Sequence, residues 1–344
     1  MSVSRLDEAA VARVVAQLQT AKKVVLTTHE GADGDGIGCE VAMARALRDR
    51  GHVVSIVNSG PTARRFAFLD PAAEIKVYRP ALARTLLDAD LVVLLDTAEI
   101  RRTGPIAEVL ATRSAPTLAI DHHPFNGATI AGISAPAFSS TGEVLCELFD
   151  RMGVALDRGL AFPLYCAILF DTNQFRFIRN DANVFRHAAR LVEAGADAEA
   201  ASRHLFGTVP RDRLVLQARV LQGAHFECGG RLAWATVTPE TLSGLQVDQD
   251  DVRTMVMVLG EVQGVAIAVL FKQFRDGGTV KVSIRSPGDI PISDIVEALG
   301  GGGHPFAAGA DVDAPLDEAI ARTLPPLRAR LGAPDEAPTH SVSS

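Results

Sequence analysis

The sequence predicts an α/β fold, in which an N-terminal parallel sheet with helices on both faces is joined by helices to a smaller C-terminal α/β domain. Short apolar, β-branched runs alternate with segments of helical periodicity in the first part of the chain, which is typical of a parallel sheet. After a break at residues 207–210, the pattern changes to strands that include a hairpin. The length of 344 residues and the 47% hydrophobic content allow two full cores.

The first part of the chain alternates between predicted strands and predicted helices. An amphipathic helix is expected over 4–19, because apolar residues recur there at helical spacing. Strands are expected at 24–28, 53–57, 75–78, 91–95 and 117–120. Helical periodicity runs from Gly38 to Asp49, and it returns after Ser140 and Glu143, whose spacing predicts a capping box. A mostly apolar segment at 160–170 and helices at 181–194 and 197–206 complete this part.

The second part has a different order of elements. Strands are expected at 232–237, 265–271 and 279–284, and helices near 251–260, at 292–299 and at 315–331. The turn Asp276-Gly277-Gly278 predicts that the last two strands form a hairpin. We therefore expect a first domain over 1–207, a connecting helix over 208–224, a second domain over 225–332 and a disordered tail over 333–344.

Charge and composition restrict the partners and the compartment. The net charge of −7 gives no global attraction to long nucleic acid. Four cysteines without metal-binding spacing, at 39, 146, 166 and 228, fit a reducing compartment. No run of apolar residues has the length of a signal peptide or of a membrane span. A cytoplasmic protein that binds no membrane is predicted.

A loop after the first predicted strand brings together one imidazole and two carboxylates. His29, Asp33 and Asp35 lie among glycines, directly before a helical segment. In open α/β sheets this is where ligands bind. The alternatives are a solvated Asp/Gly turn or a dinucleotide loop, but no Gly-x-Gly-x-x-Gly spacing fits and two carboxylates would repel a pyrophosphate. The residue types favour a divalent metal.

Three further acidic or histidine-containing motifs follow apolar segments. Asp96 follows the strand at 91–95, the Asp121-His122-His123 triplet follows the strand at 117–120, and Asp171 ends the segment at 160–170. A single Asp in such a place is commonly a helix cap, but capping does not explain four motifs in sequence. The combined ligands are His29, Asp33, Asp35, Asp96, His122 and Asp171. Oxygen and imidazole donors without thiolates suit Mn²⁺, with Mg²⁺ as the alternative, and one bridging carboxylate would let them hold two ions.

These motifs together resemble the DHH phosphoesterase family, and within it the branch that degrades very short RNA (nanoRNA) and dephosphorylates 3′-phosphoadenosine-5′-phosphate (pAp). The resemblance covers about residues 10–330 and includes several further motifs. These are Asn126, residues 139–143, Asp171-Thr172 before Phe175-Arg176, and Arg285-Ser286 with the glycine run at 300–304 and Ala307-Ala308-Gly309. The last motifs resemble the DHH-associated domain, which grips the nucleotide part of the substrate.

The resemblance implies a role for each matching residue. One metal would take His29, Asp33 and Asp96, and the second would take Asp35, Asp96, His122 and Asp171, so that Asp96 bridges. His123 would bind the scissile phosphate or protonate the leaving oxygen, which makes His123 and Asp96 the catalytic residues. The substrate-binding residues would be His123, Asn126, Arg285, Ser286, Gly301, Gly302, Gly303 and His304. Two positions depart from the family pattern: Asn173, where glycine is common, and Pro305, where a polar or basic residue is frequent.

Two of these substrate-binding motifs also have simpler interpretations. The glycine run could be a flexible turn between a helix and a strand, and it lacks the Lys-Ser/Thr that a phosphate-binding P-loop requires. Arg285 could form a surface salt bridge. A guanidinium beside closely spaced backbone N–H groups is nevertheless well suited to a second phosphate.

The expected activity is two-metal hydrolysis of short oligoribonucleotides to mononucleotides, with pAp as a further substrate, in a cleft between the domains. The alternatives are a cyclic or linear dinucleotide phosphodiesterase, a long-strand exonuclease, an inorganic pyrophosphatase and a catalytically silent nucleotide sensor. The acidic charge argues against stable binding of long strands. A homodimer is compatible with the sequence.

Overall fold

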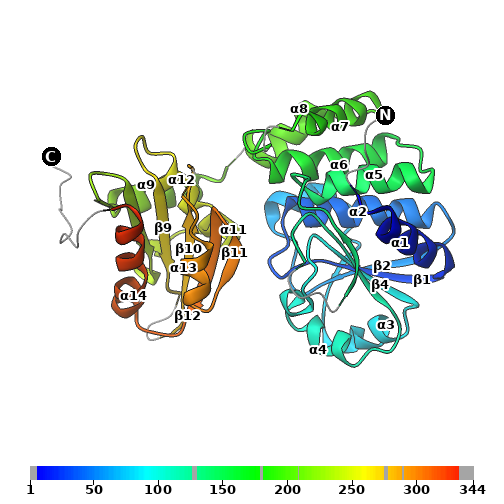
Figure 1. Cartoon of the computed structure of the whole chain (residues 1–344), viewed down its shortest axis with the longest axis horizontal. Coiled ribbons are helices and arrows are strands. Elements are labelled where there is room, and N and C mark those ends of the chain that lie inside the picture. The colour runs from blue at the N-terminus through cyan, green and yellow to red at the C-terminus, as the bar shows by residue number, and fades with distance from the viewer. Residues whose placement is uncertain are drawn as a thin grey trace. The chain divides into compact units, whose positions relative to one another are not determined.

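The computed structural model describes residues 6–125, 130–178, 181–207, 209–274, 278–288 and 290–332, with only the backbone of His304. The chain divides into two compact units, Met1–Thr208 and Val209–Ser344 (Figure 1). Each unit has one six-stranded sheet. Among the described residues, no helix is long and apolar enough to cross a membrane.

The sheet of the first unit is parallel throughout, in the order β3-β2-β1-β4-β5-β6. Its strands are β1 (Lys23–Thr27), β2 (Val53–Asn58), β3 (Ile75–Val77), β4 (Leu91–Leu95), β5 (Thr117–Asp121) and β6 (Ala131–Ser134). The strand order reverses between β1 and β4. In a parallel sheet, the carboxyl ends of the strands on either side of such a reversal border the usual ligand site.

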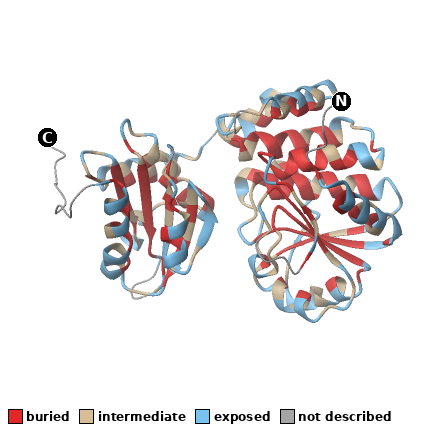
Figure 2. Ribbon diagram, in the orientation of Figure 1, coloured by how far each residue is buried: buried red, intermediate tan, exposed pale blue. Residues whose placement is uncertain are grey.

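Helices cover both faces of this sheet, as predicted, and the strands are therefore apolar on both sides. Alternate residues of β1 point to opposite faces: Leu26 joins the core under α2, α5 and α6, whereas Val25 joins the core under α3 and α4. Figure 2 shows that buried residues fill the strands and the inner sides of these helices. The helices are α1 (Glu8–Thr20), α2 (Gly34–Arg48), α3 (Ala83–Leu87), α4 (Ile106–Ala111), α5 (Thr141–Met152), α6 (Arg158–Asp171), α7 (Ala182–Glu193) and α8 (Ala198–Ser202). The short 3₁₀ helices are η1 (Arg64–Leu69), η2 (Pro80–Leu82) and η3 (Ile100–Thr103), and η4 (Arg203–Gly207) is a π-helical turn.

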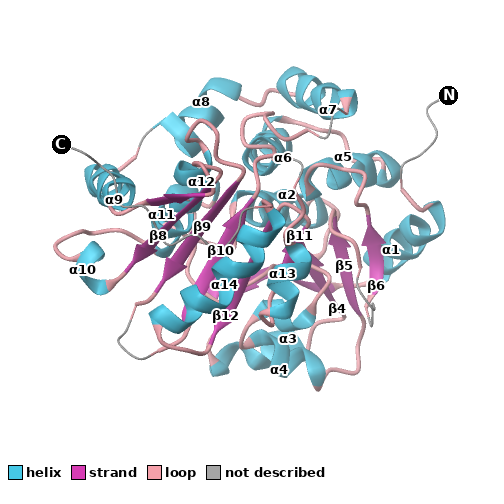
Figure 3. Cartoon of the chain, turned by 60° about the vertical axis from the view of Figure 1, so that its left-hand side comes forward, coloured by secondary structure: helices cyan, strands magenta, loops and turns pink. Residues whose placement is uncertain are grey.

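The second unit has a mixed sheet in the order β11-β12-β10-β9-β8-β7, in which only the β8–β9 pair is parallel. Helices α9, α11 and α12 pack on one face, and α13 and α14 on the other, where they cross the strands in Figure 3. The strands are β7 (His225–Glu227), β8 (Leu232–Val237), β9 (Ile267–Lys272), β10 (Val280–Arg285), β11 (Gly302–His304) and β12 (Ala307–Val312). The helices are α9 (Arg211–Gln222), α10 (Pro239–Leu242), α11 (Gln249–Arg253), α12 (Met255–Gly260), α13 (Ser293–Ala298) and α14 (Leu316–Arg330).

The structure refines several predicted elements. The predicted connecting helix is α9, and its Leu216 and Val220 pack in the core of the second unit. The helix predicted near 251–260 is the pair α11 and α12, which meet at Thr254. The predicted hairpin joins β9 and β10, although Asp276 and Gly277 of its turn lie outside the described residues. The predicted tail at 333–344 also lies outside them.

The predicted capping box at the start of α5 forms only in part. The Ser140 side chain accepts a hydrogen bond from the Glu143 N–H, as expected of an N-cap. The Glu143 carboxylate accepts from the N–H of Ser139, at 2.8 Å, where a capping box would have it accept from the N-cap residue itself. The N-terminus of α5 is held in place by both contacts, and this end of the helix borders the site described next.

Candidate active site

The loop after β1 delivers its side chains through a helix cap. Asp33 is the N-cap of α2, and its carboxylate accepts from the backbone N–H of Asp35 at 3.1 Å. His29 Nδ1 lies 2.9 Å from the carbonyl oxygen of Glu30, which leaves Nε2 to face Asp33 and Asp96. A side chain at Gly36 would place its Cβ 2.6 Å from Thr28 Oγ1, so glycine is required for the tight turn into the helix. The local sequence thus presents one nitrogen and two carboxylates at the carboxyl end of β1.

Asp96 follows β4 in a backbone conformation that side chains rarely adopt. Its φ is +61°, in the left-handed region, which aspartate tolerates better than most residues. Asp96 as a residue is 4% exposed, and Thr141 Oγ1 donates to its Oδ1 at 2.9 Å. Strain of this kind clusters at functional sites. Here it places the carboxylate between His29 and His122.

Six side chains gather into groups that could hold a metal ion. One group is His29, Asp33 and Asp96, and another is Asp35, His122 and Asp171. These are the residues that the sequence analysis divided between two metals, and Asp96 contacts both groups, with Oδ2 3.6 Å from His29 Nε2 and Oδ1 3.6 Å from His122 Nε2. The structure also places Asp96 with Asp121, His122 and His123 in a further group of the same kind.

The distances within the groups fit donors that surround a cation. His29 Nε2 lies 3.9 Å from Asp33 Oδ2, and His122 Nε2 lies 3.4 Å from Asp171 Oδ2. These separations are longer than the roughly 2.7–3.2 Å of a direct hydrogen bond. Two donors that bind the same ion at about 2.1 Å each are separated by roughly 3–3.5 Å. The His122–Asp171 distance lies in this range, and the His29–Asp33 distance is slightly longer. The nitrogen and oxygen donors therefore suit a divalent metal.

Asp35 shows why the site needs positive charge. Its carboxylate is fully buried and accepts from the backbone N–H groups of Thr141 and Gly142, at 2.7 and 3.0 Å, at the N-terminus of α5. Burial, together with the negative charges of Asp96 and Asp171, nevertheless raises the pKa of Asp35 well above its ordinary value. A cation in the cluster would offset this repulsion.

Asp171 reaches the cluster from a helix and not from a strand end. It is the last residue of α6, and the apolar segment before it packs against α2. The next residues, Asn173, Gln174 and Phe175, all have positive φ, from +46° to +64°. At position 173, where the family commonly has glycine, asparagine tolerates the left-handed conformation, so this departure leaves the turn intact.

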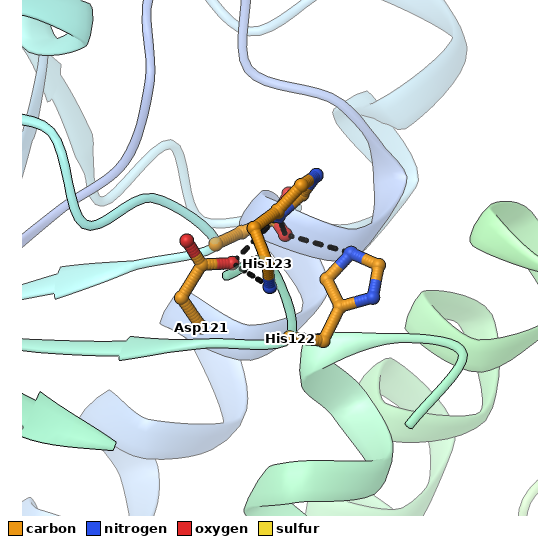
Figure 4. Close-up of side chains that lie close together, drawn as sticks. Asp121, His122 and His123 are labelled. Atoms are coloured by element: carbon orange, nitrogen blue, oxygen red, sulfur yellow. Dashed lines mark hydrogen bonds and ion pairs between the residues drawn. The ribbon is translucent and has the colours of Figure 1, made fainter. Parts of the chain in front are cut away.

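His123 is set apart from the two ligand groups by its partner. Its Nδ1 lies 2.7 Å from Asp121 Oδ1, and the same oxygen accepts from the His123 backbone N–H at 3.0 Å (Figure 4). Burial acts to lower the pKa of His123, but the Asp121 carboxylate raises it to about 9. The Asp121 carboxylate therefore favours the protonated form of this imidazole.

Sequence reasoning assigned no role to Asp121, although it begins the triplet. It is the last residue of β5 and is 1% exposed. An aspartate that directly follows an apolar, buried strand needs a partner for its charge. This position in the sequence could have indicated a role for Asp121. The structure identifies that partner as His123.

The predicted substrate-binding residues of the second unit lie around β10 and β11. Arg285 ends β10, and its Nη1 donates to the carbonyl oxygen of Ile284 at 2.9 Å. Ser286 is 6% exposed, and its hydroxyl has no hydrogen-bond partner among the described residues. Asn126 lies outside the described residues, and so does the side chain of His304.

The glycine run at 300–304 enters a strand and is not simply a turn. Gly302–His304 form β11, which pairs with β12. A Cβ at Gly303 would come within 2.6 Å of the Ala307 oxygen, and one at Gly301 within 2.2 Å of the Gly309 oxygen. Close approach of two backbones therefore explains two of these glycines, whereas a Cβ at Gly302 would meet nothing within 4 Å. The position of Gly302 borders open space.

Comparison with known proteins agrees with this architecture. Residues 23–168 match the DHH family, N-terminal domain, and residues 229–325 match the DHHA1 domain. A crystal structure of an exopolyphosphatase-related protein from Bacteroides fragilis superimposes with a TM-score of 0.85 over 96% of this chain and 98% of that chain. At 22% identity, this match establishes the shared fold.

Two relatives in sequence carry established names. The bifunctional oligoribonuclease and PAP phosphatase NrnA of Thermus thermophilus is 33% identical over 325 residues, which are 93% of this chain and 94% of the relative. The cyclic-di-AMP phosphodiesterase GdpP of Geobacillus thermodenitrificans is 27% identical over 84% of this chain, but over only 44% of its own length. With both domains matched in order and a relative of this identity over nearly its full length, the chain belongs to the DHH family of phosphoesterases, with a DHHA1 domain after its DHH domain.

Proposed function

We propose that this protein is a Mn²⁺-dependent phosphoesterase that hydrolyses short oligoribonucleotides to mononucleotides and pAp to AMP. The observation that carries the proposal is the cluster in which Asp96 contacts both donor groups beside His123, whose Nδ1 lies 2.7 Å from Asp121 Oδ1. The named activity of the Thermus thermophilus relative supports the substrate class.

The donor sets support two metals per site. His29, Asp33 and Asp96 would hold one ion, and Asp35, Asp96, His122 and Asp171 would hold the other. Such a pair lowers the pKa of a bound water and so supplies hydroxide near neutral pH. Oxygen and imidazole donors without a thiolate favour Mn²⁺, with Mg²⁺ as a weaker substitute.

The protein's own residues then position and protonate the substrate. His123 directs its Nδ1–H to Asp121, so Nε2 carries the second proton of the imidazolium. That proton can be donated to a phosphoryl oxygen or to the leaving oxygen, while Asp121 stabilises the positive charge of the ring. Asp121 is thus a positioning residue for His123.

The second unit supports selection of the substrate. Arg285, Ser286 and the run Gly301–His304 would hold the nucleotide part of the substrate, and Asn126 and His123 would contact the scissile phosphate. The support is the Arg285 guanidinium, a Ser286 hydroxyl without a hydrogen-bond partner among the described residues, and the open position of Gly302. Inorganic pyrophosphate would need no such groups.

Activity on cyclic dinucleotides is the second candidate, because of the similarity to GdpP over 84% of this chain. The test is a rate comparison on pAp, di- to pentaribonucleotides, cyclic di-AMP and pyrophosphate, with Mn²⁺ and with Mg²⁺. We expect the largest kcat/KM on dinucleotides or pAp, with Mn²⁺, and loss of turnover on chelation. A preference for cyclic di-AMP would support the second candidate, and a preference for pyrophosphate would refute both.

We further propose that the protein is cytoplasmic, that its RNA partners are short, and that it binds no long nucleic acid stably. None of the four cysteines forms a disulfide, and burial raises the pKa of the Cys146 thiol well above its ordinary value, which disfavours the reactive thiolate and fits a structural role. A homodimer is part of the proposal, and analytical ultracentrifugation with and without Mn²⁺ tests it.

A further inference from the structure

The second unit buries a lysine side chain that has no role in the proposed catalytic steps. Lys272 is the last residue of β9 and is only 4% exposed. Its ammonium group donates to Ser283 Oγ at 2.7 Å. In the register of β9 and β10, Lys272 lies opposite Lys281, and Ser283 is the next residue on that face toward Arg285. Lys272 therefore extends along the same face of the sheet as Arg285.

The charges around this face do not balance. Burial, followed by the positive charges of Lys281, Arg285 and Arg253, lowers the pKa of Lys272 to about 7, and Asp311 alone opposes them. Burial and Arg253 also lower the pKa of Arg285 to about 10. The nearby carboxylates have other partners, since Asp250 pairs with Arg253 at 2.9 Å and Asp311 with Lys281 at 3.9 Å.

Buried cations are normally paired with an anion. Within the described part of the chain, no carboxylate lies within 4.0 Å of the charged group of Lys272 or of Arg285. A hydroxyl and a carbonyl oxygen are their only hydrogen-bond acceptors there. The two cations are therefore suited to an anion that comes from outside the chain.

The strands next to these cations carry glycines in the rows that pair with Ser283. Ser283 pairs with Gly309 of β12, and Gly309 pairs with Gly302 of β11. Neither glycine has a side chain on the face that carries Ser283. A Cβ at Gly302 would meet no atom within 4 Å. The floor next to Lys272 and Arg285 is therefore bare backbone.

We propose that Lys272 is a substrate-binding residue that, with Arg285, holds the phosphate group that the enzyme does not cleave. The inference rests on the proposed function: conversion of pAp to AMP removes the 3′-phosphate and retains the 5′-phosphate. The ligand at Lys272 is then the 5′-phosphate of a nucleotide, so the enzyme distinguishes 5′-phosphorylated dinucleotides from those with a free 5′-hydroxyl.

The test uses the full chain with Lys272→Met, Lys272→Arg and the control Lys281→Met. The control removes the same charge from the neighbouring strand, at a side chain that is 60% exposed. Calorimetry with AMP and with adenosine measures binding, and kcat and KM are measured on dinucleotides with and without a 5′-phosphate. Bis-p-nitrophenyl phosphate, which has no second phosphate, reports on the metal centre alone.

We expect Lys272→Met to weaken AMP binding roughly 10- to 100-fold, the usual effect of losing a charged hydrogen bond. The preference for the 5′-phosphorylated dinucleotide should fall through KM, while turnover of bis-p-nitrophenyl phosphate is kept. Lys272→Arg should recover part of the affinity, and Lys281→Met should change it less than threefold. The melting temperature of Lys272→Met should not fall, because an apolar side chain replaces a buried charge without a carboxylate partner.

Protonation gives an independent readout. AMP is fully ionised at pH 8, where Lys272 is mostly neutral in the free protein because its pKa is about 7. A bound phosphate raises the pKa of Lys272, so the protein should take up a proton when AMP binds. Calorimetry in two buffers of different ionisation enthalpy measures this uptake, because the binding enthalpy then differs between the buffers. Lys272→Arg should bind without this uptake.

Two results would overturn the inference. One is an unchanged affinity of Lys272→Met for AMP. The other is a fall in the melting temperature of Lys272→Met together with an equal loss of affinity for AMP and for adenosine, which would show that Lys272 is structural. Failure of the proposed function looks different, because the wild-type protein would then cleave bis-p-nitrophenyl phosphate but neither pAp nor any oligoribonucleotide. The AMP-binding comparison still decides the role of Lys272 in that case.

Discussion

The first unit buries the carboxyl group of Glu40 next to an asparagine side chain and, within the part of the chain that the structure describes, not next to a cationic one. Glu40 lies on α2, is 0% exposed, and its Oε2 accepts from Asn58 Nδ2 at 2.8 Å. Its Oε1 and the Oδ1 of Asn58 have no hydrogen-bond partner among the described residues. Burial raises the pKa of Glu40 from 4.5 to about 8, although the hydrogen bond from Asn58 acts to lower it. Glu40 is therefore protonated in the folded protein at neutral pH.

The raised pKa of Glu40 makes the free energy of unfolding depend on pH. Between the unfolded pKa of 4.5 and the folded pKa of about 8, the folded protein binds a proton that the unfolded chain has lost. Stability must therefore fall as the pH rises through this window, by about 1.4 kcal/mol per pH unit, and level off above it. Glu40→Gln keeps a hydrogen-bond acceptor for Asn58 and removes the titration. From pH 5.5 to 7.5, the variant should gain about 2–3 kcal/mol relative to the wild type.

Urea unfolding of the metal-free full chain, followed by circular dichroism at several pH values, measures this gain. Glu74→Gln is the control, because it removes a carboxylate whose side chain is 49% exposed, in a surface ion pair with Arg48. Its stability difference should stay below about 1 kcal/mol at every pH. A difference between Glu40→Gln and the wild type that is the same at pH 5.5 and 7.5 would refute the reasoning.

The remaining predictions concern the metals, the proton donor and the substrate. Asp96→Ala should lower the metal content of both donor groups and Asp35→Ala that of one, as elemental analysis would show; normal two-metal content in Asp96→Ala would contradict the bridging role. His123→Ala should keep both metals and lose about 10²–10⁴-fold in kcat, and loss of a metal would instead make this histidine a ligand. Asp121→Asn should also lower kcat without changing metal content, and an unchanged rate would rule out its positioning role. Arg285→Ala should reduce kcat/KM on pAp and dinucleotides but not on bis-p-nitrophenyl phosphate, and an equal loss on both classes would refute substrate selection by this residue.

The sequence predicts most of this fold because the strands of the first unit are buried on both faces. Runs such as 91–95 are apolar throughout and too short for helices, so their type and order can be read directly. The same reasoning misses the short edge strand β7, and it misses β6, β11 and β12, which consist largely of alanine and glycine. Pairing with a neighbouring strand, and not local preference, makes these segments extended.

The sequence likewise predicts some parts of the candidate site and not others. The side chains after β1, β4 and β5 were predicted to gather because parallel strands end at one edge of a sheet, and they do gather. Asp171 was expected to ligate but arrives from α6, since an apolar run of that length does not distinguish a strand from a buried helix. The hold of α5 on Asp35 depends on contacts more than 100 residues apart, and no local pattern reports such contacts.

The contacts among α2, α5 and α6 also determine how far apart the donor groups lie. A Cβ at Gly38 of α2 would come within 2.5 Å of the Pro163 oxygen in α6, and a Cβ at Gly142 of α5 within 2.8 Å of the Ala167 Cβ. Each of these helices supplies or holds part of the site: Asp35 on α2, its backbone donors on α5, and Asp171 on α6. Because a Cβ at either glycine would force the helices apart, we expect glycine-to-alanine substitutions at these positions to widen the spacing between the donor groups without replacing any donor side chain.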